Sequence, residues 1–343
     1  LNIAGVWEEF SALVEKSGIP VVTSLMGLGS FPSDHRLHLG MVGMHGTFAA
    51  NQSVTHSDLL IGIGVRFDDR VTGMVSKFAP NARIVHLDID PAEINKNVPT
   101  DIRVVGHLKW SLPLLNRLLE PGEIGEWVNQ VLEWKTTHPL NYQESLDVIK
   151  PQRVVQAINM ITDGEGFIVT DVGQHQMWTA QYYNFRHPRS FITSGGLGTM
   201  GFGLPAAIGV QFGYPDRLVW TISGDGSILM NIQEIATMVE HDLPIKVAVL
   251  NNRGLGMVRQ WQRMFFKKRY SASKHEQGTD IAGVAQAFGA KGIKVREHEQ
   301  LLPALQEAMA YSGPVIIDIL VAEEEDVLPM VPAGAPIDQM IGG

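Results

Sequence analysis

The residues with the clearest chemical meaning follow two apolar segments in the second half of the chain. Gly224-Asp225-Gly226-Ser227 comes after the apolar run at 218–223, and Asn251-Asn252 comes after the run at 246–250. Such short apolar runs are typical of buried parallel strands, and parallel sheets bind ligands at the carboxyl edge of their strands. One helix and one strand separate the two motifs, so the spacing predicts that the Asp225 carboxylate and the Asn252 amide lie close together.

These two side chains have the chemistry of a magnesium site. Carboxylate and amide oxygens are hard ligands that suit Mg²⁺, which usually completes its octahedral shell with phosphate oxygens and water. Glycines on both sides of Asp225 would let a diphosphate approach the backbone, where amide groups can donate to it. The alternative is that Gly224–Gly226 is an ordinary turn and Asn251-Asn252 an unrelated loop.

A second glycine motif suggests a different ligand. Gly196-Leu197-Gly198-Thr199-Met200-Gly201 fits the dinucleotide fingerprint, follows a strand-like run and precedes a plausible helix at 204–208. The match is weak in a chain with 35 glycines. Asp225 stands about where a ribose-binding acid is expected, but its place between two glycines is unusual for that role. The nicotinamide hypothesis is therefore disfavoured.

The remaining patterns predict an α/β protein with two doubly wound parallel-sheet domains. In the first, residues 1–121, we expect a helix at 6–17, strands at 20–23, 59–65 and 83–87, and a helix that begins at Pro91 with Asp90 as its N-cap.

A helical, polar linker at 122–150 precedes the second domain, residues 151–321, and a tail at 322–343 is expected to lie extended on a surface. The second domain should contain a helix at 152–161 and strands at 166–170, 190–193, 218–223, 246–250 and 315–321, the last closing the sheet. Asn231 and Glu234 have the spacing of a helix capping pair.

Composition excludes several classes of protein. Hydrophobic residues make up 45% and charged residues 18%, as in globular proteins, and the net charge of −9 argues against binding to nucleic acid or an anionic membrane. The absence of cysteine excludes disulfides, thiolate nucleophiles and cysteine-ligated zinc. No membrane span or secretory signal is visible, so the cytoplasm is expected, or an organelle if a targeting peptide was removed.

Across its whole length the sequence resembles the catalytic (large) subunit of acetohydroxyacid synthase, also called acetolactate synthase. The Gly-Asp-Gly and Asn-Asn pair is a pattern of thiamine diphosphate enzymes in general. The closer resemblance rests on GMHGT at 43–47, RFDDRVTG at 66–73, DIDPAEI at 88–94, GQHQMW at 173–178, SGGLGTMG at 194–201 and LGMVRQWQ at 255–262.

The resemblance implies a transferase that uses thiamine diphosphate, Mg²⁺ and a non-redox FAD. Such enzymes condense pyruvate with a second 2-ketoacid, pyruvate or 2-ketobutyrate, with loss of CO₂. The products are 2-acetolactate or 2-aceto-2-hydroxybutyrate, on the path to valine, leucine and isoleucine. The first domain would then be the FAD-binding-like middle domain, and the second would bind the diphosphate of the cofactor.

The resemblance also assigns roles to residues of the second domain. Asp225 and Asn252 would bind Mg²⁺ through side chains and Gly254 through its backbone carbonyl. The residues assigned to the diphosphate are Gln174, His175, Gln176, Gly226 and Ser227, and those assigned to the aminopyrimidine are Gly198 and Met200. Met257 is assigned to both the cofactor and the substrate entrance, and Trp261 and Phe265 are assigned to the substrate entrance.

The resemblance assigns three residues to catalysis, Met200, Trp261 and, in the first domain, Arg70, and each has a simpler alternative. Met200 matches the bulky residue that keeps the cofactor bent, but it could be a core methionine. Trp261 matches the residue that favours 2-ketobutyrate, whereas an isolated tryptophan is more often core or interface. Arg70 would contact the carboxylate of the second ketoacid; the alternative is a surface ion pair with Asp68 or Asp69.

The FAD assignment covers two stretches of the first domain, 45–66 and 88–107. By itself, His45 would be interpreted as a loop histidine with satisfied hydrogen bonds. The residues that the resemblance assigns to FAD are His45, Gly46, Thr47, Arg66, Asp88 and Asp90.

The family also has an N-terminal pyrimidine-binding domain, which carries the glutamate that protonates the cofactor and has no counterpart in these residues. We therefore expect either a fragment or a chain complemented by another, inactive by itself. The family implies a homodimer and, in many members, a small regulatory subunit. Two further candidates are another thiamine diphosphate enzyme, such as pyruvate oxidase or a non-FAD acetolactate synthase, and a binding remnant without catalysis.

Overall fold

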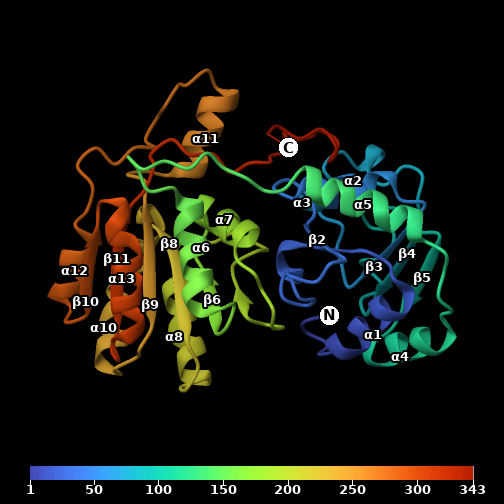
Figure 1. Cartoon of the computed structure of the whole chain (residues 1–343), viewed down its shortest axis with the longest axis horizontal. Coiled ribbons are helices and arrows are strands. Elements are labelled where there is room, and N and C mark those ends of the chain that lie inside the picture. Colours follow the sequence, from blue (N-terminus) through green and yellow to red (C-terminus); the bar gives the residue numbers. More distant parts are fainter. Residues whose placement is uncertain (343) are drawn as a thin grey trace. The chain divides into compact units, whose positions relative to one another are not determined.

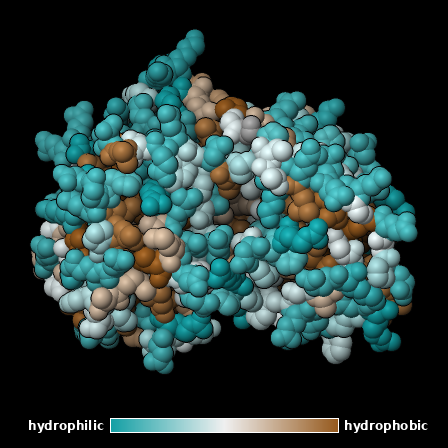
Figure 2. All heavy atoms as spheres, in the orientation of Figure 1, coloured by the Kyte–Doolittle hydropathy of each residue, from teal (hydrophilic) through white to brown (hydrophobic). Residues whose placement is uncertain are grey.

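The computed structural model describes residues 1–342, which form two compact units that we consider separately (Figure 1). The first unit comprises residues 1–141, residues 185–189 and the described part of the chain from Leu328. The second comprises residues 142–184 and 190–327. The face drawn in Figure 2 is mostly hydrophilic in both units, with hydrophobic side chains gathered in small patches.

The second unit is built on a six-stranded parallel sheet in the order β10-β11-β9-β8-β6-β7. Its strands are β6 (Phe167–Thr170), β7 (Phe191–Ile192), β8 (Val219–Gly224), β9 (Lys246–Asn251), β10 (Lys291–Val295) and β11 (Val315–Leu320). In β8 and β9 every residue is buried, which explains why their sequences are mostly apolar. Gly224 pairs with Leu250, so the two strands end at the same edge of the sheet.

Helices cover both faces of this sheet. They are α6 (Pro151–Thr162), α7 (Gln174–Tyr182), α8 (Gly203–Gly213), α9 (Asp225–Ile228), η3 (Ile232–Glu234), α10 (Ile235–Glu240), α11 (Gly256–Phe265), α12 (Ile281–Ala287) and α13 (His298–Ala310). Val247 and Val249 pack in a core with residues of α8, α10 and α12. The Trp220 indole points to the opposite face, where it donates to the sulfur of Met309 in α13 at 3.4 Å.

The first unit contains a three-stranded parallel sheet, β3-β4-β5, and a parallel pair, β1-β2. Its strands are β1 (Val21–Thr23), β2 (His38–Met41), β3 (Leu59–Ile63), β4 (Arg83–Asp88) and β5 (Ile102–Val105). Its helices are α1 (Trp7–Ser17), η1 (Leu25–Gly27), α2 (Phe48–His56), α3 (Asp69–Thr72), η2 (Val75–Lys77), α4 (Leu108–Leu118) and α5 (Gly125–Thr137).

The C-terminal segment belongs to the core of the first unit and is not a surface strap as its sequence suggests. Met330, Val331 and Ile337 are almost completely buried. The backbone N–H of Val331 donates to the Met44 carbonyl at 2.7 Å, and that of Met74 donates to the Ala335 carbonyl at 3.0 Å. Residues 322–327 form the last part of the second unit.

Three further expectations from sequence were wrong. No helix begins at Pro91: the Asp90 carboxylate accepts from the Ala92 N–H at 2.9 Å and closes a turn. The run at 315–321 forms β11, an inner strand, because β10 adds the edge strand beside it. Asn231 and Glu234 do not cap each other: Asn231 donates to the Gly201 carbonyl at 2.6 Å, and Glu234 accepts from Thr237 at 2.9 Å.

Across residues 1–342, no helix has both the length and the apolar character that a membrane crossing requires.

We expect His38 to make the stability of the first unit sensitive to acid. The side chain is buried in β2, with ring Nε2 3.3 Å from the Thr23 hydroxyl. Burial, together with the positive charge of Lys135, lowers the pKa of His38 from 6.5 to about 4. The unfolded chain therefore binds a proton that the folded chain excludes, so this stability is present above pH 6.5 and lost as the pH falls towards 4.

We expect the free energy of unfolding of the wild type to fall by about 1–2 kcal/mol more than that of His38→Gln between pH 7 and pH 5. Glutamine is polar and close in size but does not titrate. Urea unfolding followed by circular dichroism at both pH values measures the difference. Identical acid dependence in the two proteins would contradict the assignment.

Candidate functional site

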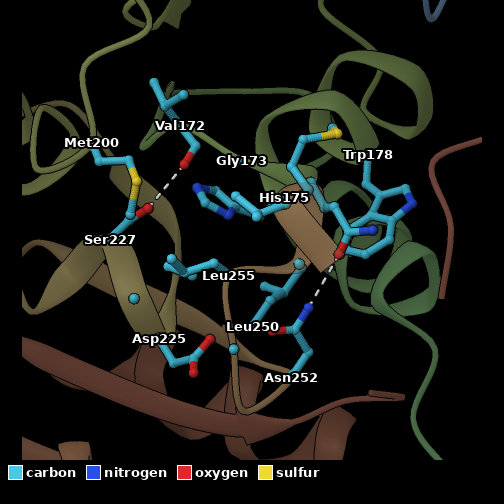
Figure 3. Close-up of a pocket in the computed structure, with 17 residues that line it drawn as sticks. Val172, Gly173, His175, Trp178, Met200, Asp225, Ser227, Leu250, Asn252 and Leu255 are labelled. Atoms are coloured by element: carbon cyan, nitrogen blue, oxygen red, sulfur yellow. Dashed lines mark hydrogen bonds between the residues drawn. The ribbon is translucent and has the colours of Figure 1, made fainter. Parts of the chain in front are cut away.

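A pocket of about 440 Å³, including the open space at its mouth, lies at the carboxyl edge of the sheet in the second unit (Figure 3). Its walls come from the ends of β8 and β9 and from the starts of α7, α9 and α11. The lining residues are Val172, Gly173, Gln174, His175, Trp178, Met200, Gly224, Asp225, Gly226, Ser227, Leu250, Asn252, Gly254, Leu255, Gly256, Met257 and Val258.

The structure brings Asp225 and Asn252 to this pocket, on the segments that follow β8 and β9 (Figure 3). Both side chains are buried. Asp225 Oδ2 lies 2.9 Å from Nδ1 of His275, whereas Oδ1 is buried and accepts no hydrogen bond from the residues of the structure. An unpaired buried carboxylate oxygen is unfavourable, so this atom is suited to a cation.

Burial raises the pKa of Asp225 above its ordinary value, and the hydrogen bond from His275 works in the opposite direction. Hydrogen bonding by the backbone of Gly254 also lowers this pKa. Among residues 1–342 there is no group of three or more His, Asp or Glu side chains that could hold a metal. The donors at the pocket are instead one carboxylate, one amide and backbone groups, a set that suits Mg²⁺ when phosphate and water complete the shell.

Asn252 is held by a chain of buried side chains. Its amide nitrogen donates to Gln174 Oε1 at 3.1 Å, which leaves the amide oxygen for another partner. Gln174 Nε2 in turn donates to Gln260 Oε1 and to the Glu325 carbonyl, both at 2.8 Å. Gln260 accepts from the Val327 N–H at 2.9 Å. This network ties the pocket to α11 and to the segment at 322–327.

Glycines make room for this arrangement. A Cβ on Gly226 would lie 2.6 Å from the Leu255 side chain, and one on Gly224 would lie 2.9 Å from Nδ1 of His175. Such contacts are too close for any residue larger than glycine without displacement of its neighbours. A larger residue at Gly224 would therefore press on the buried His175 ring, and one at Gly226 would require the Leu255 side chain to move.

His175 is a buried neutral group in the pocket wall. Burial lowers its pKa to about 3, although a hydrogen bond to the backbone of Asp171 acts the other way. Its Nε2 has no hydrogen-bond partner among the described residues. Ser227, beside it in the pocket, donates to the Val172 carbonyl at 2.9 Å (Figure 3).

Met200 lines the pocket and is half-buried, so it is not a core methionine. Its loop is fixed by Asp171, whose Oδ1 accepts from the Gly201 N–H at 2.7 Å. Gly198, in the same loop, is exposed with a φ of +69°. Gln176 is buried, but its amide donates to the Thr193 hydroxyl at 2.7 Å and it does not line the pocket.

Met257, Trp261 and Phe265 are spaced four residues apart on α11 and so share one face of the helix. Met257 lines the pocket. The rings of Trp261 and Phe265 meet edge to face with centroids 5.2 Å apart, and both remain partly exposed. The three side chains form a partly exposed apolar surface that leads away from the pocket.

Arg70 and the residues expected to bind FAD lie in the first unit. Arg70 is exposed, with Nη1 3.6 Å from Asp69, the surface ion pair that the sequence left open as an alternative. His45 is buried, and burial lowers its pKa to about 4. Thr47 accepts from the Ala50 N–H at 3.1 Å and so caps α2. A Cβ on Gly46 would lie 2.6 Å from the Met41 carbonyl.

Arg66 follows β3, and Asp88 is the last residue of the neighbouring parallel strand β4. Both therefore lie at the carboxyl edge of the first sheet. The Arg66 guanidinium is exposed and pairs with Asp68 at 3.2 Å. Asp88 accepts from the Asp90 N–H at 2.9 Å.

Sequence reasoning missed His275, Gln260 and Asp171 as parts of the site. His275 lies in a polar loop with no periodic pattern, 50 residues from Asp225. Gln260 falls within the LGMVRQWQ motif, but nothing in that motif indicates a partner 86 residues away. Asp171 could have been found, because it follows the apolar run of β6 just as Asp225 follows that of β8.

Comparison with known proteins identifies the two halves of the chain. Residues 1–116 match the central domain of thiamine pyrophosphate enzymes, and residues 171–319 match their C-terminal TPP binding domain. Acetolactate synthase 1, chloroplastic, from Nicotiana tabacum is 45% identical over 97% of this chain and 52% of its own length. Relatives in two bacteria are 43% identical over 60% of their own length: acetolactate synthase isozyme 3 large subunit of Escherichia coli and the large subunit of Haemophilus influenzae.

The chain spans about half the length of the curated relatives it matches. The family matches agree with the fold, since both units contain parallel sheets, and with the pocket at the carboxyl edge of the second sheet. The chain therefore belongs to the thiamine pyrophosphate enzymes, of which it comprises the central and C-terminal domains, and it is a homologue of the acetolactate synthase catalytic subunits.

Proposed function

We propose that the pocket of the second unit binds thiamine diphosphate with Mg²⁺. Asp225 and Asn252 would hold the metal through their side chains, and Gly254 through its backbone carbonyl. One observation supports the proposal: the two side chains line the same pocket at one sheet edge, with the buried Asp225 Oδ1 unpaired within the described structure.

The charges of the pocket favour joint binding of metal and diphosphate. Its lining includes one acidic side chain, Asp225, and neither lysine nor arginine. His175 stays neutral because burial keeps its pKa at about 3. A diphosphate alone would meet no cationic side chain and one carboxylate, so a divalent cation is needed to bridge the two. We expect thiamine diphosphate to bind weakly without Mg²⁺.

We further propose that the diphosphate lies at the start of α7 and beside Gly226 and Ser227. Gly173, Gln174 and His175 line the pocket where α7 begins, and helix N-termini attract anions. The Gln174 side chain is engaged with protein partners, so it would contribute its backbone N–H group. Gln176 would support the diphosphate site from behind the pocket wall, because its amide donates to Thr193 and its backbone N–H donates to the Gly173 carbonyl at 3.2 Å. Gly198 and Met200 would lie against the aminopyrimidine.

The activity that this assignment supports best is condensation of pyruvate with a second 2-ketoacid, either pyruvate or 2-ketobutyrate. The names of the relatives support it, since all three are acetolactate synthases. The cofactor would supply the electron sink, and the protein would orient it. Met200 would keep the cofactor bent, and Met257, Trp261 and Phe265 would receive the substrate. The role of Arg70, in the first unit, towards the carboxylate of the second ketoacid is proposed from the family resemblance alone.

We also propose that the first unit binds FAD without redox function. Arg66 provides an exposed cation at the carboxyl edge of β3, and Asp88 and Asp90 provide acceptors at the end of β4. His45, Gly46 and Thr47, which the resemblance also assigns to FAD, are engaged in local packing and hydrogen bonds. This assignment depends on the sequence resemblance together with this placement of polar groups.

The assembly and location are proposed from the same relatives. A homodimer is expected from the family, and a regulatory partner is suggested because two bacterial relatives are called large subunits. The tobacco relative is described as chloroplastic. For this chain we propose the cytoplasm, or an organelle if a targeting peptide was removed.

Asp225→Asn tests the metal site. The substitution keeps the size of the side chain but removes the charge that faces the cation, so we expect Mg²⁺-dependent binding of thiamine diphosphate to fall below detection in titration calorimetry. Asp280→Asn, at the exposed start of α12, is the matched control and should leave binding unchanged. Equal affinity of wild type and Asp225→Asn would refute the metal assignment.

Arg66→Ala tests the flavin site, with Arg103→Ala on exposed β5 as the control of equal charge. We expect the wild type and Arg103→Ala to retain FAD through gel filtration, and Arg66→Ala to bind it about tenfold more weakly, because a hydrogen bond to a charged group is lost. The absence of flavin from the wild type would contradict the proposal for the first unit.

Product analysis tests the reaction. With pyruvate, Mg²⁺, thiamine diphosphate and FAD, we expect acetolactate only when a polypeptide that carries the pyrimidine-binding domain is also supplied, because that domain holds the glutamate that activates the cofactor. Acetolactate with unreduced flavin supports the proposal. Flavin reduction by pyruvate would favour an oxidase, binding without any product would favour a non-catalytic role, and turnover by the 343 residues alone would contradict the requirement for that domain.

A further inference from the structure

His275 approaches the pocket from a loop that packs along the metal-binding segment. The Leu255 N–H donates to the Ser273 carbonyl, and the His275 N–H donates to the Arg253 carbonyl, both at 2.9 Å. Gly254 and Lys274 form an isolated antiparallel bridge between these two hydrogen bonds. The loop is therefore registered on residues 253–255 by backbone hydrogen bonds, and its position fixes where the His275 ring lies.

The ring meets only one of the two carboxylate oxygens. Nδ1 lies 2.9 Å from Asp225 Oδ2, while Oδ1 is buried and lacks a partner among the residues described. A Cβ on Gly226 would lie 3.4 Å from Cε1 of His275, so the ring also rests against the glycine that follows Asp225. The His275 side chain is 31% exposed, so it is not a core residue.

Asn252 is held in the same way: one atom of its side-chain amide is hydrogen-bonded to the protein, and the other is not bonded to any residue described. Its amide nitrogen is bound by Gln174, itself bound by Gln260, and its oxygen remains for the pocket. Each of the two side chains thus has a protein partner from outside the Gly-Asp-Gly and Asn-Asn motifs. In metal sites such outer partners orient the ligands, and their loss usually weakens metal binding 10–100-fold.

We propose that His275 is a positioning residue for Asp225: its Nδ1–H holds Oδ2 so that Oδ1 faces the metal. The inference rests on the proposed Mg²⁺–thiamine diphosphate site and adds to it a residue that its sequence motifs do not contain. The competing role is that His275 blocks the carboxylate and must leave before the metal binds. The two roles predict opposite changes in metal affinity.

Three substitutions of His275 separate these roles. The amide nitrogen of asparagine reaches about the position of Nδ1, whereas that of glutamine reaches about the position of Nε2, and leucine provides no donor. We expect His275→Leu and His275→Gln to weaken Mg²⁺ binding about 10–100-fold at saturating thiamine diphosphate, and His275→Asn to restore most of the affinity. His298→Leu, at the start of α13, is the control for loss of a histidine elsewhere in the unit.

The readout is calorimetric titration of Mg²⁺ into the 343-residue chain with thiamine diphosphate, alongside thermal unfolding without metal. A structural role alone would lower the unfolding temperature of the metal-free chain, and excess Mg²⁺ would not restore cofactor binding. If His275→Leu does not fold, the Mg²⁺ affinities of His275→Gln and His275→Asn are compared instead. Unchanged or tighter Mg²⁺ binding in His275→Gln overturns the inference, and no Mg²⁺-dependent binding by the wild type overturns the proposed function with it.

Discussion

The parallel register of β8 and β9 is the constraint on which the site depends. Because Gly224 pairs with Leu250, Asp225 and the Asn251-Asn252 pair leave the sheet side by side. A slip of one residue would turn every side chain of a strand to the opposite face. Both strands are buried at every position, with Val247 and Val249 in the core on one face, so the hydrophobic packing that stabilises the unit also fixes the geometry of its polar edge.

At that edge, buried polar groups are largely satisfied by one another. Gln174, Gln260 and Asn252 form a connected chain of hydrogen bonds that ends on the backbone of residues 325 and 327. Fully paired buried networks are rigid, while an unpaired member is unfavourable. Asp225 Oδ1 and His175 Nε2 are two pocket atoms that no described residue satisfies. The residues behind the pocket wall are thus hydrogen-bonded to one another, whereas these two atoms at the pocket are not. This arrangement is expected where a bound ligand supplies the missing hydrogen bonds or metal contacts.

The sequence predicts those parts of the fold whose physics is local. The strands β8, β9 and β11 are buried on both faces, so their composition alone identifies them. The edge strand β10 has the sequence KGIKV and is mostly half-buried, which leaves no such signal. The placement of Val331 and Ala335 depends on hydrogen bonds with Met44 and Met74 that no local pattern encodes. Asp225 and Asn252 could be predicted because each follows a strand, whereas His275 and Gln260 reach the site only through distant tertiary contacts.

The glycine motif at 196–201 shows why spacing alone misleads. Its pattern is that of a dinucleotide loop, yet the Gly201 N–H donates to Asp171 and is not available to a phosphate. The Gly201 carbonyl accepts from the Asn231 amide. Gly201 has a φ of +90°, and a Cβ there would lie 2.8 Å from the Asn231 amide. Glycine is required here by the backbone and by its neighbours. Since these two hydrogen bonds fix the residue after Met200, the motif holds that side chain at the pocket wall, and its glycines serve the geometry of the loop that carries Met200.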